Sequence, residues 1–90
     1  MASETFLTDA LREAGWQLSE DGRAICKTYR FAGFRDALAW MVRAGFEAEA
    51  ADHHPEWVNV YNRVEVRLTT HDAGGLTSKD TALALAFEAL

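Results

Sequence analysis

The chain has 90 residues, and its 14 acidic against 9 basic side chains give a formal net charge of −5. Hydrophobic residues make up 49% of it, which is enough apolar surface to offset chain entropy, so we expect one folded domain over residues 1–90 and exclude disorder. The acidic balance, without a cluster of basic residues, excludes nucleic acid as a favoured partner. With one cysteine and no long apolar run or targeting segment, we expect no disulfide, no membrane contact and a cytoplasmic location.

The first third of the chain predicts a helix followed by a hairpin. Apolar side chains at helical spacing indicate a helix over Ser3–Ala14, and Gly15 is a residue typical of the position just after a helix end. Trp16–Leu18 and Ala24–Phe31 are predicted to be paired strands, because the second segment alternates in polarity. Glu20-Asp21-Gly22 between them is a turn sequence.

The strongest helical pattern covers Phe34–Ala51, and the chain then returns to strands. Apolar residues recur along that helix at three- and four-residue steps in one wide stripe: Phe34, Ala37, Leu38, Met41, Gly45 and Ala48. We expect His53-His54-Pro55 to end it, since proline disfavours helical angles in the preceding residue. Trp57–Tyr61 and Arg63–Thr70 are predicted strands, although a two-residue turn at Asn62 is not assured.

The C-terminal part predicts a loop and a last helix. Ala73-Gly74-Gly75 is the loop, and Ser78–Leu90 is the helix, with Leu83, Phe87 and Leu90 on one side. In the strand before the loop, Val64, Val66 and Leu68 are predicted to face the core. The order α-β-β-α-β-β-α and the alternating strands favour a two-layer α+β domain, in which helices cover one face of an antiparallel sheet.

The three histidines are the candidate reactive residues, because the pKa of an ordinary imidazole lies near neutral pH. His53 and His54 follow the long helix and His71 follows the last strand, and such element ends often carry functional sites. Acidic residues accompany them in sequence: Glu49, Asp52 and Asp72. If the helix continues, Glu49 and His53 share one of its faces.

Two other interpretations of these histidines stay open on the residues alone. They could be ordinary surface side chains at element ends, with His53 stabilised by the helix dipole. A metal site is less favoured, because adjacent histidines diverge in an extended backbone and no His-x-x-x-His or paired-cysteine spacing is present.

The segments that carry the histidines resemble the pterin-4a-carbinolamine dehydratase family. The resemblance is carried by Glu49–Trp57, which includes the Asp-His-His-Pro-Glu-Trp run, by Val60–Val64, and by Leu68–Thr77, which includes Thr-Thr-His-Asp. Gly15-Trp16 and Phe31–Phe34 are similar upstream, so the likeness covers nearly the whole chain. Ala50 and Ala51, and a short N-terminal segment, depart from the family pattern.

The resemblance implies a four-stranded antiparallel sheet with helices on one face and a lyase activity. The implied reaction dehydrates 4a-hydroxytetrahydrobiopterin to the quinonoid dihydropterin, which supports tetrahydrobiopterin recycling for an aromatic amino-acid hydroxylase. It implies no metal and no cofactor. Family members form dimers or tetramers through sheet edges and helices, so we expect a homodimer or homotetramer, which suits an undersized core.

The resemblance also assigns roles to residues. His53 and His71 would be the acid/base pair, in an order left open, and His54 would hold the pterin. Weaker assignments put Thr69, Thr70 and Trp57 beside the pterin and give Glu49, Asp52, Pro55 and Asp80 supporting roles. Trp57 is equally well explained as core filler, and Asp80 as the partner of Thr77 in a capping box.

Two further functions compete with the dehydratase. Animal relatives also act as dimerisation cofactors for a homeodomain transcription factor, which would make the chain a binding module. A pterin enzyme of another pathway, such as molybdopterin metabolism, would keep the same pocket. A substrate panel separates the second of these from the dehydratase.

Overall fold

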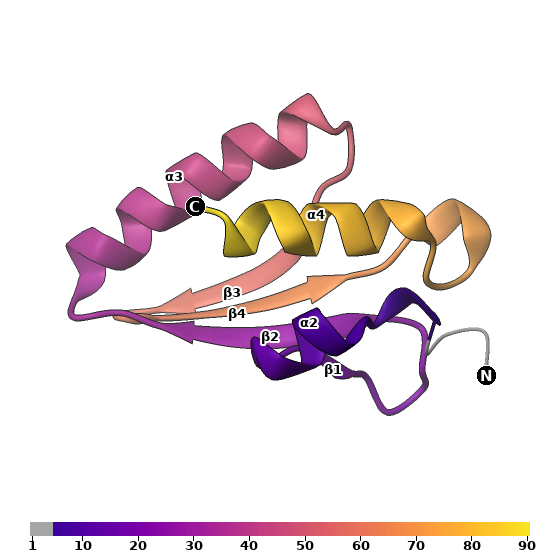
Figure 1. The fold of residues 1–90 in the computed structure, drawn as a ribbon. Coiled ribbons are helices and arrows are strands. Elements are labelled where there is room, and N and C mark those ends of the chain that lie inside the picture. The colour runs from indigo at the N-terminus through magenta and orange to yellow at the C-terminus, as the bar shows by residue number, and fades with distance from the viewer. Residues whose placement is uncertain (1–4) are drawn as a thin grey trace.

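The protein, described here for residues 5–90 by a computed structural model, is a sheet with helices packed on one face (Figure 1). The elements in chain order are α2 (Asp9–Glu13), β1 (Gln17–Leu18), β2 (Ile25–Arg30), α3 (Phe34–Ala50), β3 (Glu56–Val60), β4 (Arg63–Leu68), the 3₁₀ turn η1 (His71–Ala73) and α4 (Ser78–Glu88). This order confirms the predicted two-layer α+β class. Within the described residues, no helix has the length and apolar character needed to cross a bilayer.

The sheet is antiparallel throughout, with strand order β1-β2-β4-β3. The predicted first hairpin is confirmed, β3 and β4 form a second one, and β4 joins the two by pairing with β2 over six residue pairs from Ile25–Leu68 to Arg30–Arg63. The second hairpin closes through two residues, Tyr61 and Asn62, and the Asn62 side-chain amide donates to the carbonyl of Phe31. Asn62 therefore also holds the end of β2 against this turn.

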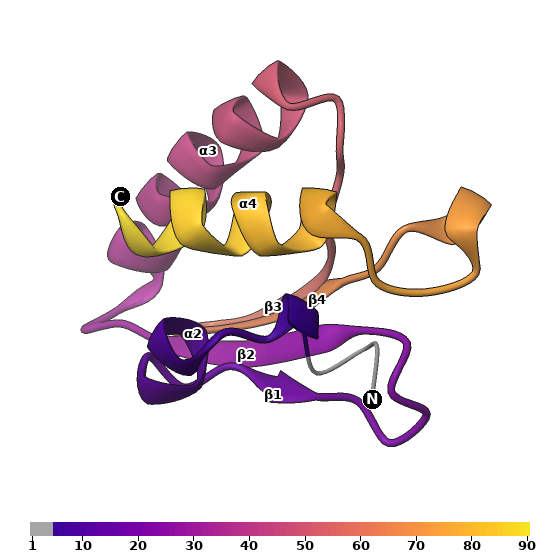
Figure 2. The ribbon, with the colours of Figure 1, turned by 45° about the vertical axis from the view of Figure 1, so that its right-hand side comes forward.

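The core lies between the sheet and the helices, as the alternation in β4 predicts. Val64, Val66 and Leu68 are all buried. They pack with buried residues from the other elements: Leu7, Leu11, Trp16, Ile25, Ala37, Trp40, Ala44, Ala48, Leu83, Ala84 and Phe87. Figures 1 and 2 show α3 and α4 crossing the same face of the sheet in two views.

Helix α3 is apolar on two faces, which the single predicted stripe did not separate. The face against the core consists of Ala37, Trp40, Ala44 and Ala48. Phe34 and Leu38, which were predicted in the same stripe as Ala37, lie about half exposed. Small residues at three of the four core positions let the helix approach the sheet closely while Trp40 fills the space between them.

Two helices end in the same hydrogen-bonded motif but use different residues. After α2, Gly15 (φ 104°) donates its N–H to Arg12 and Trp16 donates to Leu11, so the predicted role of Gly15 is confirmed. After α3, Asp52 (φ 50°) takes the equivalent left-handed position, with Asp52 N–H bonded to Glu49 and the next N–H to Ala48. The helix therefore ends before Pro55, by this motif.

Several predicted bounds are corrected. Ser3 and Glu4, the start of the first predicted helix, lie outside the described residues. Thr5 and Phe6 are helical, but the helix is interrupted at Leu7 and Thr8, and α2 begins at Asp9, where the Thr8 hydroxyl caps the Leu11 N–H. The last strand ends at Leu68, and a 3₁₀ turn occupies part of the expected loop. Helix α4 ends at Glu88, so Leu90 is exposed beyond it.

The C-terminal end of α4 is tied to the sheet through one carboxylate. Glu88 Oε2 accepts from Trp16 Nε1 at 3.1 Å, from Lys27 Nζ at 2.7 Å and from the Tyr29 hydroxyl. Burial and the hydrogen bond to Glu88 raise the pKa of the Tyr29 phenol, so this group stays protonated and donates. These contacts attach the C-terminal end of α4 to β2 and to the segment before β1.

Candidate active site

His53 is turned toward the interior by the way α3 ends. Because Asp52 adopts a left-handed conformation, the chain leaves the helix axis and the His53 N–H bonds back to the Ala48 carbonyl at 3.1 Å. The His53 side chain is only 10% exposed. It therefore does not continue the exposed face of the helix. Because α3 ends before His53, Glu49 and His53 do not share a helix face, as they would if the helix continued.

The partner of His53 is Asp80, a fully buried carboxylate in the first turn of α4. The His53 Nε2 lies 2.5 Å from Asp80 Oδ1. Asp80 Oδ2 accepts from the Thr70 hydroxyl at 2.8 Å and from the Thr77 N–H at 3.0 Å. The last bond completes the predicted capping box, and the contact with His53 shows that the same carboxylate also lies beside a candidate reactive residue.

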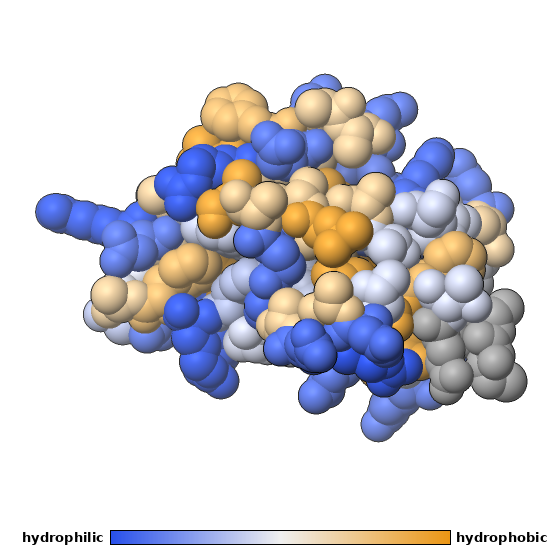
Figure 3. Space-filling model, in the orientation of Figure 1, coloured by the Kyte–Doolittle hydropathy of each residue, from blue (hydrophilic) through white to orange (hydrophobic). Residues whose placement is uncertain are grey.

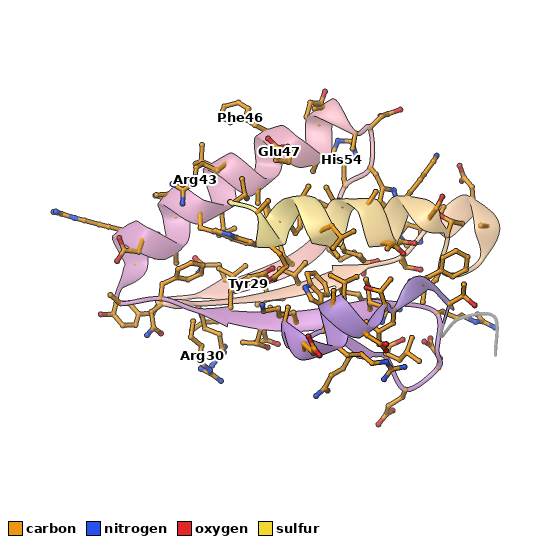
Figure 4. All side chains as sticks on the ribbon, in the orientation of Figure 1. Tyr29, Arg30, Arg43, Phe46, Glu47 and His54 are labelled. Atoms are coloured by element: carbon orange, nitrogen blue, oxygen red, sulfur yellow. The ribbon has the colours of Figure 1, made fainter. Side chains whose placement is uncertain are left out.

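His54 and His71 lie near carboxylates as well, but at the surface. His54 Nε2 is 2.8 Å from Glu49 Oε1, and its side chain is 59% exposed. Figure 4 shows His54 at the start of the connection that follows α3. His71 Nε2 is 3.2 Å from Glu56 Oε2 and its side chain is 78% exposed. Each histidine thus has Nε2 beside a carboxylate, and the pair with His53 is the buried one.

The three histidines line one open cavity of about 320 Å³, formed where the exit of α3 meets the end of β4 and the start of α4. The lining residues are Asp52, His53, His54, Thr69, Thr70, His71, Asp72 and Lys79. Figure 2 shows the α3–β3 connection passing beside the start of α4. Segments 18 residues apart therefore present imidazoles to the same space, which is the size of a small-molecule pocket.

The other predicted site residues divide into those in the cavity and those outside it. Thr69 and Thr70 line it, and the Thr69 hydroxyl donates to the Arg23 carbonyl at 2.6 Å. Trp57 is not among the lining residues; it packs on Trp40 with ring centroids 6.3 Å apart, which agrees with core filler. Pro55 lies in the connection between His54 and β3, also outside the lining.

Sequence reasoning missed two contributors to the site. Lys79 brings a positive charge to the cavity from the first turn of α4, and the only signal for it was its place beside Asp80. Glu56 is the carboxylate next to His71, although the two are 15 residues apart. Because β3 and β4 pair, the start of one strand lies beside the end of the other, and the tertiary fold alone makes this contact.

The side chains that could ligate a metal are dispersed around the cavity. Among residues 5–90, no three histidine, cysteine, aspartate or glutamate side chains gather closely enough to hold an ion. The histidine Nε2 atoms instead each lie beside a separate carboxylate, Asp80, Glu49 or Glu56. This arrangement suits imidazoles that exchange protons with a bound molecule, since a neighbouring carboxylate orients the ring and leaves Nδ1 for a ligand.

A family model described as pterin 4 alpha carbinolamine dehydratase matches residues 2–90 of the chain. The chain belongs to this family. Curated relatives that carry its name agree. A protein of Novosphingobium aromaticivorans, provisionally named pterin-4-alpha-carbinolamine dehydratase, is 56% identical over 88 residues, which span 91% of this chain and 92% of the relative. One of the same provisional name from Opitutus terrae is 63% identical over 75 residues, 82% of this chain and 75% of its own.

A solved structure supports the same family at the level of the fold. The crystal structure of a protein from Brucella melitensis, described as a transcriptional coactivator/pterin dehydratase, superposes with a TM-score of 0.81 at 38% identity. The match covers 92% of this chain and 95% of that one. The fold implied by the resemblance of the histidine segments is therefore confirmed.

Proposed function

We propose that the protein dehydrates a 4a-hydroxytetrahydropterin, such as 4a-hydroxytetrahydrobiopterin, to the quinonoid dihydropterin and water. The observation that carries the proposal is the convergence of His53, His54 and His71 on one cavity in a chain of the pterin carbinolamine dehydratase family. The product would return to a tetrahydropterin-dependent enzyme such as an aromatic amino-acid hydroxylase.

The chemistry needs two proton transfers on adjacent atoms of the substrate. The C4a–O bond breaks as the hydroxyl takes a proton and leaves as water, and the proton on the neighbouring ring nitrogen is removed as its electron pair forms the C=N bond. One acid and one base therefore suffice, and each such group typically contributes about 10²–10⁴-fold. Both protons are exchanged with imidazoles, so the enzyme ends the reaction with the same total number of protons.

The environments of the histidines support different roles. His53 is buried and oriented by Asp80, which suits a group that must keep one geometry through the reaction. His71 lies across the cavity rim on the η1 turn, exposed and beside Glu56, where protons can exchange with solvent. We assign these two as the acid/base pair. His54, which is also exposed, is assigned to binding of the pterin, with Thr69 and Thr70 beside it.

A stopped-flow assay tests the proposal. The carbinolamine is generated enzymatically and its absorbance decay is followed with and without the purified protein. We expect His53→Ala and His71→Ala each to lower kcat by about 10²-fold or more. With the double variant, the carbinolamine should decay at the uncatalysed rate. His54→Ala should raise KM more than it lowers kcat. Glu65→Gln, on the uncovered face of the sheet, is the matched control. If the carbinolamine decays as fast with the double variant as with the wild type, His53 and His71 are not the acid/base pair.

We also propose that two copies associate through α3. Phe34, Leu38, Val42 and Phe46 form an exposed apolar row at four-residue spacing along this helix. Phe46 points away from the sheet in Figure 4, and Figure 3 shows apolar surface along α3. An apolar row of this kind is typical of an interaction surface. A domain of 90 residues has a small core, so burying this row against a partner would add to its stability.

A second copy of the chain is the proposed occupant, because a two-fold pairing lets the same apolar row on each α3 cover the other. We expect Leu38→Glu with Val42→Glu to reduce the mass measured by light scattering by a factor of two or more. An unchanged mass would exclude α3 as the interface.

A further inference from the structure

The buried Asp80 carboxylate joins the two histidine segments through a short chain of hydrogen bonds. The Thr70 Oγ1 lies 2.8 Å from Asp80 Oδ2 and 2.8 Å from Thr77 Oγ1. Thr77 Oγ1 also accepts from the Lys79 N–H at 3.3 Å. On its other oxygen, Asp80 contacts His53 Nε2 at 2.5 Å. The sequence alone assigned no proton-positioning role to the Thr70 or Thr77 hydroxyl.

Counting protons gives the chain a direction. Each hydroxyl has one proton to donate. Asp80 Oδ2 accepts from the Thr77 N–H, which can only donate, and from the Thr70 hydroxyl, so Oδ2 carries no proton of its own. Thr70 has then used its proton, and the bond between the two hydroxyls must be donated by Thr77. Asp80 Oδ1 faces His53 Nε2 at 2.5 Å, and when the carboxylate is ionised the donor in this contact is the imidazole Nε2–H.

We propose that Thr70 is a positioning residue that holds Asp80 so that neutral His53 carries its proton on Nε2 and offers Nδ1 as the proton-accepting atom. The hydroxyl of Thr70 occupies Asp80 Oδ2, which leaves Oδ1 free to accept from the imidazole. The catalytic consequence of this arrangement rests on the function proposed above, whereas the proton position in His53 does not.

Thr70 also sets where His71 lies. Its backbone bonds in both directions to Gly75, at 3.1 and 3.3 Å, and its carbonyl accepts from the Ala73 N–H at 3.1 Å. These bonds close the turn that contains His71. The Thr70 side chain therefore attaches the turn that contains His71 to the carboxylate that contacts His53.

Three variants isolate this hydroxyl. Thr70→Val keeps the shape and removes the donor, and Thr70→Ser restores it. Thr81→Val is the matched control, because Thr81 is a half-buried hydroxyl of α4 that donates to the Phe6 carbonyl at 2.7 Å, away from Asp80. The ring nitrogens of His53 are followed by ¹⁵N NMR at about pH 8, where histidines are ordinarily neutral, and kcat and KM are measured in the dehydration assay.

In the wild type and in Thr70→Ser and Thr81→Val, we expect the His53 proton on Nε2. In Thr70→Val, we expect a mixture of tautomers and a kcat lower by about 10–100-fold, with KM changed far less, as for a misplaced catalytic group. A wild-type His53 that is protonated on Nδ1 overturns the proposal without any variant, and so does Thr70→Val with both tautomer and kcat unchanged. A wild type that is inactive but shows the expected tautomer, lost in Thr70→Val, supports the positioning role and rejects the dehydratase function.

Discussion

The Glu88 carboxylate offers a quantitative test of how α4 is held on the sheet. Glu88→Gln keeps the shape of the side chain and removes its charge. One oxygen of Glu88 accepts from Trp16, Lys27 and Tyr29, and the Lys27 side chain is only 16% exposed. A neutral amide in place of the carboxylate would leave that ammonium largely buried without its counter-ion. Because hydrogen bonds to charged groups contribute about 1.5–3 kcal/mol, we expect the free energy of unfolding at neutral pH to fall by roughly that amount.

The pH dependence of this difference has a definite sign. Burial raises the pKa of Glu88, but the hydrogen bonds from Lys27, Tyr29 and Trp16 outweigh it and lower the pKa below its ordinary value of 4.5. The stabilisation is therefore fully present above the unfolded-state pKa and is lost as the pH falls through the folded-state pKa. The gap between wild type and Glu88→Gln should shrink in that acidic window.

Urea unfolding followed by tryptophan fluorescence, at neutral pH and at about pH 3.5, measures this gap. Glu65→Gln is the control, since Glu65 is half exposed beside Arg63 and such surface pairs contribute about 0–1 kcal/mol. A destabilisation by Glu88→Gln that is the same at both pH values would refute the charge-based explanation and indicate that shape alone matters.

Three further changes have predictable outcomes. Asp52→Gly should raise the urea midpoint, because the left-handed conformation at φ 50° costs a non-glycine residue about 1 kcal/mol; a lower midpoint would show that the Asp52 side chain itself stabilises the helix end. Asp80→Asn should lower the free energy of unfolding by about 2–4 kcal/mol, since an amide cannot accept from all three donors, and calorimetry against wild type measures this. Thr77→Ala should cost about 0.5–2 kcal/mol through loss of the helix cap, visible as reduced helical ellipticity on heating.

Much of the site could be predicted from its residues, but the pairing of those residues could not. The three histidines were identified because of their type, their place at element ends and their resemblance to a family. Sequence spacing placed Glu49 with His53, whereas the structure pairs Glu49 with His54. Asp52 adopts a left-handed conformation, which changes the direction of the chain and cannot be predicted from helical periodicity. As a result, the His53 side chain lies in the interior beside Asp80.

From its local patterns the sequence predicts the class of fold, because alternation in β2 and β4, helical periodicity in α3 and glycine after α2 are properties of a few consecutive residues. It also identified the family through the segments around His53 and His71. Tertiary contacts were needed to show which apolar face of α3 meets the core, that Trp57 packs against Trp40, and that Asp80 pairs with His53 and Thr70, and Glu56 with His71. Those contacts join residues 10–27 positions apart, and their geometry depends on strand pairing and helix packing across the whole domain.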